Sequence, residues 1–109
     1  MAGHRARDLY AHGGLFFYGD EAGTRRGLAR DYPRAHGSPA ADDPFAVRMA
    51  DSPLLTALYL DAEASEGYHR DQNVFGPGVT IEDDMAVLVR YVSGTTLTYH
   101  LTAYAAWEG

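Results

Sequence analysis

The chain of 109 residues is long enough for one small domain with a single thin core. Its 46% hydrophobic and 22% charged residues are typical of a folded protein, and its net charge of -6 argues against nucleic acid or an anionic membrane as a partner. All nine basic residues are arginine and cysteine is absent, which excludes lysine nucleophiles, disulfides and cysteine-ligated metals within this chain.

No apolar stretch approaches the ~20 residues of a membrane span, and the amino terminus lacks a cleavable apolar segment. The lack of cysteine is compatible with a reducing compartment. We therefore expect a cytoplasmic protein that is not bound to a membrane.

The first predicted element is a strand over residues 8–18, which are rich in aromatic and strand-forming types. The pair Gly13 and Gly14 indicates a bulge or a close backbone approach within it. Residues 19–51 are polar, contain several Gly and Pro, and show no sustained periodicity. We expect a long polar loop that carries short helical turns or covers a binding surface.

A short helix is predicted from about residue 53 to 64. Ser52 is a suitable N-cap, Pro53 suits the first helical position, and leucines, Tyr59 and an alanine then recur at helical spacing. Gly67 is expected to end the helix.

A β-hairpin is predicted near the end of the chain, with one strand over residues 85–92 and a turn at Ser93 and Gly94. In its second strand, apolar residues alternate with hydroxyl-bearing residues and His100, so one face is apolar and the other polar. Strand, loop, helix and hairpin together predict an α+β fold: an open-faced, mostly antiparallel sheet with one short helix and a long polar loop.

Two groups of side chains could carry chemistry. His69, Arg70 and Asp71 could bind a polyol, although a surface ion pair explains Arg70 and Asp71 equally well. His100 could face a ligand from the polar side of its strand, although a hydrogen-bonded sheet histidine is the more common case.

Glu82, Asp83 and Asp84 could in principle bind a hard metal ion. A solvated turn in which one carboxylate caps backbone amides is favoured instead, and no metal is expected. The glycines lack the spacing of a dinucleotide-binding loop, and no serine and carboxylate are placed to complete a hydrolase triad with a histidine.

Several segments resemble one known family. The run from Glu66 to Met85, the segments 58–63 and 88–94 and the closing segment 103–109 resemble the carboxy-terminal, substrate-side domain of the Gfo/Idh/MocA oxidoreductases. The likeness extends from about residue 8 to 109.

The resemblance implies hydride transfer between NAD or NADP and a hydroxyl of a sugar or cyclitol. It also implies that the cofactor and the catalytic lysine belong to a separate upstream domain, so that this chain provides neither catalytic, cofactor-binding nor metal-binding residues. The expected substrate-binding residues are Tyr68, His69, Arg70, Asp71 and His100.

The chain departs from the family pattern at both ends. His4 and Asp8 occur in the reverse order of the family's Asp-x-x-x-His element, and Ala106 stands where a proline is usual. The family also continues into a further strand after the sequence that corresponds to Trp107–Gly109.

We therefore expect residues 1–109 to be a partial domain, inactive alone, which forms a homo-oligomer or joins a cofactor-domain partner. The alternative is a stand-alone module for sugar binding or protein assembly. A cupin-like metal enzyme is disfavoured.

Overall fold

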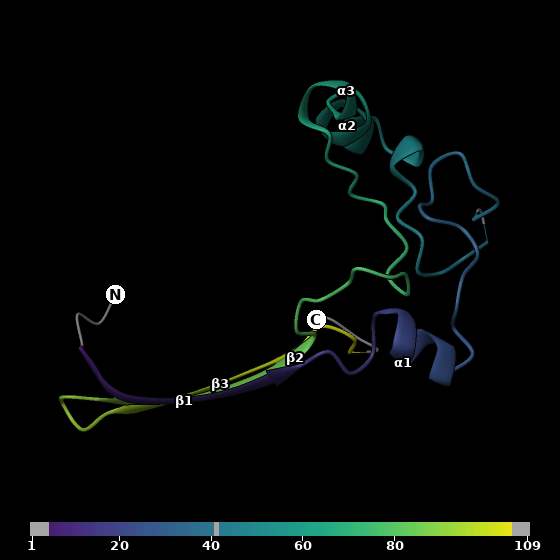
Figure 1. Ribbon diagram of the computed structural model, residues 1–109. Helices are drawn as coiled ribbons and strands as arrows, with labels where there is room; N and C mark the ends of the chain where they lie inside the picture. Colours follow the sequence, from purple (N-terminus) through teal and green to yellow (C-terminus); the bar gives the residue numbers. More distant parts are fainter. Residues whose placement is uncertain (1–4, 41, 106–109) are drawn as a thin grey trace. The chain divides into compact units, whose positions relative to one another are not determined.

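The computed structural model describes residues 5–40 and 42–105, so the predictions on His4 and on 106–109 lie outside the described residues. The chain forms two compact units (Figure 1). The sheet unit contains the residues up to Tyr18 and from Thr80 onward, and the loop unit is Gly19–Val79. Each unit is described by itself.

The sheet unit contains an antiparallel sheet with the strand order β1-β2-β3. The strands are β1 (Ala6–Gly14), β2 (Asp84–Tyr91) and β3 (Thr96–Thr102). This confirms the predicted α+β class with an open antiparallel sheet. The prediction for β1 was wrong at its end, because the backbone N–H groups of residues 16–18 bind the Asp83 carboxylate instead of extending the sheet.

The predicted hairpin is confirmed. Gly94 has a φ of 88°, a conformation that favours glycine, and its N–H donates to the Tyr91 carbonyl at 3.0 Å. The Tyr91 N–H donates in turn to the Thr95 carbonyl at 2.9 Å. The resulting register places Leu97 opposite Val89 and therefore fixes which side chains share a face.

The two faces of the sheet differ in composition, as the register shows. The first, named the apolar face, carries Leu9, Ala11, Met85, Val87, Val89, Leu97, Tyr99 and Leu101. The second, named the mixed face, carries Tyr10, His12, Asp84, Ala86, Leu88, Arg90, Thr96, Thr98, His100 and Thr102.

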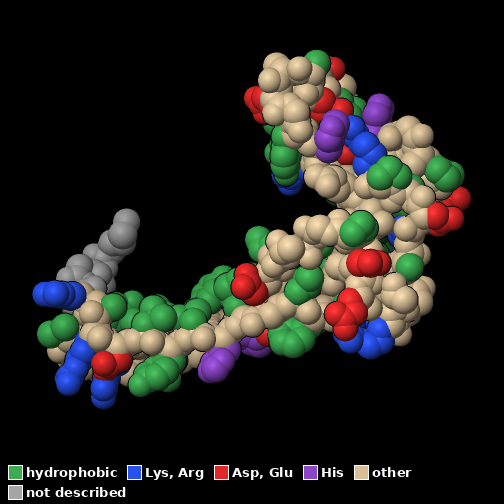
Figure 2. All heavy atoms as spheres, in the orientation of Figure 1, with side chains coloured by type: hydrophobic (Ala, Val, Ile, Leu, Met, Phe, Trp, Pro, Cys, Tyr) green, Lys and Arg blue, Asp and Glu red, His purple; other side chains and the backbone are tan. Residues whose placement is uncertain are grey.

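Much of the apolar face is open to solvent, although Val89 is buried. Leu9 is 59% exposed and Tyr99 is 47% exposed. Hydrophobic side chains are visible along the strands in the space-filling view (Figure 2). The sheet therefore presents a surface that a partner could cover.

The expected close backbone approach occurs at Gly14, where an added Cβ would lie 2.7 Å from the Phe16 ring. The irregularity in strand pairing lies elsewhere, between Ala6 and Asp8. Of the two explanations for the glycine pair, close approach is therefore the one that the structure supports.

The predicted helix at 53–64 consists of consecutive short segments: α2 (Pro53–Leu55), the π-helical η2 (Thr56–Leu60) and α3 (Glu63–Glu66). Its expected ends are confirmed. Ser52 Oγ accepts from the Leu55 N–H at 3.4 Å, and Gly67 ends α3 with a φ of 66°. The π turn, in which the Asp61 N–H donates to the Thr56 carbonyl at 3.0 Å, was not predicted.

The long polar segment carries the short helical turns that were expected, α1 (Asp20–Arg25) and the 3-10 turn η1 (Met49–Asp51). The core of the loop unit is small, with Ala22, Ala40, Met49 and Phe75 as its buried hydrophobic residues among those described. None of the helices in the described part of the chain is long and apolar enough to cross a membrane.

Candidate functional site

Arg34 is the centre of an ion-pair network in the loop unit. Its guanidinium contacts Glu63 of α3, with Nη1 donating to Oε2 at 3.0 Å and Nη2 to Oε1. Arg34 Nη2 also lies 2.8 Å from Asp71 Oδ1. The Arg34 side chain thus links its own segment to the helix α3 and to the segment that follows α3.

The backbone reinforces this junction. The His36 N–H donates to Asp71 Oδ2 at 2.6 Å, and the Ala35 N–H donates to the Asp71 carbonyl at 2.9 Å. The Asn73 N–H donates to the Pro33 carbonyl at 3.0 Å. Segments 33–36 and 71–73 are therefore held together by both backbone and side-chain bonds.

The charges of this network stabilise one another. The hydrogen bond to Glu63 is the main cause that raises the pKa of Arg34, and the same bond lowers the pKa of Glu63. The Asp71 side chain is fully buried against this cation. In this arrangement Asp71, an expected substrate-binding residue, holds two segments together, and its binding role stays a prediction.

His69 lies beside the same guanidinium. Its Nδ1 is 2.6 Å from Arg34 Nη1 and 3.4 Å from Glu63 Oε2, while 45% of its side chain is exposed. A neutral imidazole can accept a hydrogen bond from arginine at this nitrogen. Arg34 thus fixes the orientation of a partly exposed histidine.

Next to His69, a group of side chains combines the half-buried ring of Tyr59 with the exposed Tyr68 and Arg70. The Arg70 guanidinium lies over the Tyr59 ring, 4.7 Å from its centroid, and the Tyr59 and Tyr68 ring centroids are 6.5 Å apart. Tyr68 is 52% exposed. We name Tyr59, Tyr68, His69 and Arg70 the ledge. It contains three of the five predicted binding residues, together with Tyr59, which was expected only as a residue of the helix.

His100, the fifth predicted residue, belongs to the sheet unit. Its Nε2 is 3.3 Å from Asp84 Oδ1, while Thr102 Oγ1 and the Tyr104 hydroxyl donate to Asp84 Oδ2 at 3.0 and 3.1 Å. Burial would raise the pKa of Asp84, but these hydrogen bonds outweigh it and the pKa is lowered. His100 is thus the hydrogen-bonded sheet histidine that was the more common alternative, with an exposed ring.

Asp83 confirms the expected capping carboxylate of the acidic triplet. It accepts the N–H groups of Phe16, Phe17 and Tyr18 at 2.7, 2.8 and 2.7 Å. The expectation of a solvated turn was wrong at this residue, because the Asp83 side chain is buried. Among the residues with described positions, no group of three or more His, Asp and Glu is arranged to hold a metal ion.

A second ion-pair network, missed in the sequence, joins Arg30, Tyr32 and Asp43. The Tyr32 hydroxyl donates to Asp43 Oδ2 at 2.6 Å, and Arg30 Nε donates to the same oxygen. Burial, followed by the bond to Asp43, raises the pKa of Tyr32 to about 12, and Arg30 lowers the pKa of Asp43. The mixture of arginines and acidic residues over residues 19–51 is visible in the sequence. Which of these residues form ion pairs is not.

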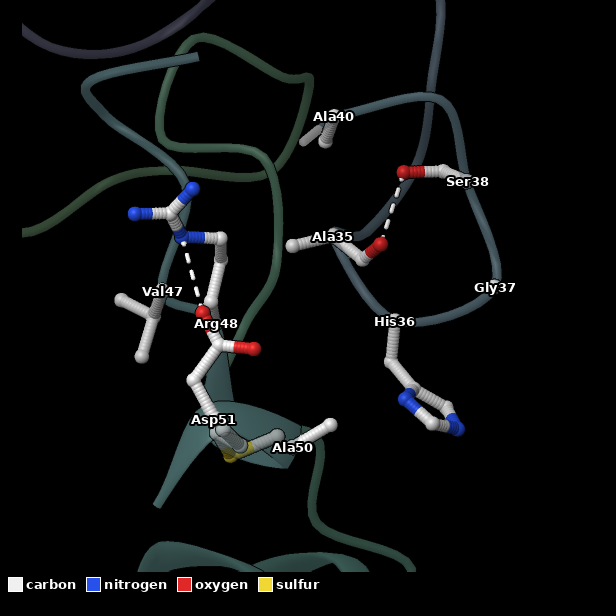
Figure 3. Close-up of a pocket in the computed structure, with 10 residues that line it drawn as sticks. Ala35, His36, Gly37, Ser38, Ala40, Val47, Arg48, Ala50 and Asp51 are labelled. Atoms are coloured by element: carbon white, nitrogen blue, oxygen red, sulfur yellow. Dashed lines mark hydrogen bonds and ion pairs between the residues drawn. The ribbon is translucent and has the colours of Figure 1, made fainter. Parts of the chain in front are cut away.

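A shallow cavity of about 190 Å³ lies among the turns of the loop unit (Figure 3). The ion pair between Arg48 and Asp51 lies at one side of it and His36 at the other, and the Ser38 hydroxyl donates to the Ala35 carbonyl at 2.8 Å. The surface of its lining is mostly apolar, and Arg48, Asp51 and Ser38 already pair with groups of the protein. The ledge is the better candidate site for a polyol.

Comparisons with protein-family models, with curated proteins and with solved structures find no match for this chain.

Proposed function

We propose that this chain is the substrate-side part of an NAD(P)-dependent oxidoreductase that acts on a hydroxyl of a sugar or cyclitol. It contributes part of the substrate pocket and an assembly surface, and it is inactive without a cofactor-binding domain. The cytoplasm is proposed as its compartment, since a chain without cysteine is compatible with reducing conditions.

The ledge is the observation that carries this proposal. Arginine donates hydrogen bonds to hydroxyls, histidine can donate or accept them, and an aromatic ring packs against the C–H groups of a sugar. Arg34 orients His69 through a 2.6 Å contact, and Tyr59 supports Arg70. Side chains that are held in place before binding lose less conformational entropy when a ligand binds.

The role of the chain in hydride transfer is limited to binding and orienting the polyol. NAD or NADP would accept the hydride when it is bound by the partner domain, and lysine, the family's catalytic residue, is absent from this sequence. The proton that the hydroxyl loses on oxidation would be accepted by a group of the partner domain, and His69 would contribute hydrogen bonds to the bound polyol.

The alternative function is a stand-alone module for sugar binding or protein assembly, of which the assembly form has an observation of its own. The exposed apolar face, with Leu9 59% and Tyr99 47% exposed, is the observation that favours it. An assembly module needs no polyol at the ledge, whereas a sugar-binding module would bind one without joining a cofactor domain.

NMR of the ¹⁵N-labelled chain during titration with myo-inositol or glucose tests the proposal. We expect shifts centred on the amides of Tyr59, Tyr68, His69 and Arg70, with a dissociation constant on the order of 1 mM because the ledge is open. Arg70→Gln should weaken this binding at least ~5-fold, since it removes both the charge and the fork of donors.

Arg90→Gln is the matched control, because it removes an arginine that pairs with Asp8 in the sheet unit. It should leave polyol binding unchanged. An absence of shifts at the ledge, or equal losses in both variants, would contradict polyol recognition. Reduction of NAD or NADP by the purified chain with a polyol would contradict its proposed inactivity.

A further inference from the structure

Strand β3 has a free backbone edge in the described part of the chain, because the sheet order is β1-β2-β3. The Ala103 N–H donates to the Asp83 carbonyl, and the Tyr91 N–H donates to the Thr95 carbonyl. These bonds show that the odd-numbered residues of β3 face β2. The even-numbered ones, Thr96, Thr98, His100 and Thr102, therefore direct their N–H and C=O groups outward.

The two edge strands differ in how well they are protected against pairing. Strand β1 contains Arg7 and Asp8, a pairing irregularity beside them and the Gly13–Gly14 pair, all features that discourage a further strand. Strand β3 contains no Gly, Pro, Asp, Glu or Arg. The edge of β3 is thus free of charge and of any strand-breaking residue in a protein of net charge -6.

The sequence of β3, Thr-Leu-Thr-Tyr-His-Leu-Thr, reads almost the same in both directions about Tyr99. In an antiparallel pair of two such strands centred on Tyr99, Leu97 lies opposite Leu101 of the second copy. Thr96 then lies opposite Thr102, and Thr98 opposite His100. A two-fold interface requires self-complementarity of this kind.

We propose that two copies of this chain associate through their β3 edges, antiparallel and about a two-fold axis at Tyr99. The outward groups of the even-numbered residues then exchange about eight backbone hydrogen bonds. The leucines and tyrosines of the two apolar faces become neighbours across the seam, and no like charges are brought together. The result is one continuous sheet that contains the three strands of each copy.

A charge-swap experiment at Tyr99 tests this interface by sedimentation velocity on the full chain. Tyr99→Lys and Tyr99→Glu each place like charges directly opposite one another, so each alone should raise the dimer dissociation constant at least ~10-fold. An equimolar mixture of the two variants should restore the dimer. Far-UV circular dichroism checks that each variant keeps the fold.

Leu9→Lys and Leu9→Glu are the matched controls, because Leu9 lies on the same apolar face but on the β1 edge. They should leave the dimer intact. Equal weakening by the Leu9 and Tyr99 variants would instead show that two sheets stack face to face, and weakening by the Leu9 variants alone would show pairing through β1. Either result overturns the proposal.

Hydrogen exchange of the unmodified chain provides a test that no folding defect can obscure. The outward amides of Thr98 and His100 should gain protection as protein concentration rises, whereas the exposed amides of β1 should not. A chain that stays monomeric, or amides whose exchange is independent of concentration while dimers form, would overturn the proposal. The inference does not depend on polyol binding at the ledge.

Discussion

At the scale of single residues, two buried carboxylates each hold distant segments of the chain together through hydrogen bonds. Asp83 accepts hydrogen bonds from three consecutive backbone N–H groups. Asp71 forms an ion pair with Arg34 and accepts a hydrogen bond from the His36 N–H. Each carboxylate satisfies backbone groups in a segment that has no regular structure to do so. The types of these residues suggested capping or ion pairs, but their partners lie 35 or more positions away, beyond the reach of sequence patterns.

The substitution Asp83→Asn should destabilise the protein by about 1.5–3 kcal/mol at pH 7, because charge-assisted bonds to three N–H groups are lost. Burial raises the pKa of Asp83, but the three N–H donors outweigh it and the pKa is lowered. The stabilisation is therefore present above the unfolded pKa, near 3.8, and is lost as the pH falls through the folded value.

Urea unfolding of both proteins at pH 7 and at decreasing pH below about 4 measures this effect. The difference between them should shrink with falling pH. Glu82→Gln removes a neighbouring exposed carboxylate and should change stability by less than about 0.5 kcal/mol. A difference that stays constant with pH would mean that the carboxylate charge is not the cause.

At the scale of elements, the hairpin strands and the helix caps followed sequence patterns closely, while the end of β1 and the helix interior did not. Ser52, Gly67 and Gly94 act locally, through one hydrogen bond or one backbone conformation, and were predicted correctly. No local signal in the sequence marks the π turn η2 (Thr56–Leu60). No local sequence pattern predicted the close contact between α1 and Phe75 either.

Gly23 of α1 permits this approach, since an added Cβ would lie 2.8 Å from Phe75 Cβ. Gly23→Ala should therefore destabilise the protein by about 1–3 kcal/mol, although alanine is the better helix former. Thermal unfolding followed by circular dichroism measures the loss.

Gly13→Ala is the control for this substitution. Its added Cβ would lie 3.1 Å from Glu82 Cγ, on an exposed side chain that can move away. The loss should be clearly smaller than for Gly23→Ala. Stabilisation by Gly23→Ala would show that helix propensity outweighs the contact with Phe75.

At the scale of the whole molecule, the two units differ in how many hydrophobic residues they bury. Four of the five buried hydrophobic residues among those described belong to the loop unit, and the sheet contributes Val89. A sheet with so little buried apolar area gains from additional strands or a covering surface. This is why both the proposed function and the proposed dimer assign a partner to it.

The net charge of -6 should oppose dimer formation, because each copy repels the other while the β3 seam itself carries no charge. Raising the ionic strength should therefore lower the dimer dissociation constant, since salt screens the repulsion. Sedimentation velocity at low and moderate salt measures this change.

The mixed dimer of Tyr99→Lys and Tyr99→Glu is the internal control. Its seam contains an attractive pair of charges, so its gain in stability with salt should be smaller or reversed. A dimer of the unmodified chain that weakens with salt would indicate an interface held by ion pairs rather than the uncharged edge of β3.

The sequence by itself determined the α+β class, the hairpin and its turn, the N-cap and the terminating glycine of the helix predicted at 53–64, and the capping role within the acidic triplet. These features arise from periodicity and from backbone preferences that act over a few residues. Only the tertiary structure decided that Arg34 binds Glu63 and Asp71, that Asp83 is buried, and that His100 belongs to a different unit from the ledge. Such pairings depend on which distant segments meet, and the energy that selects them comes from burial and charge compensation rather than from local spacing.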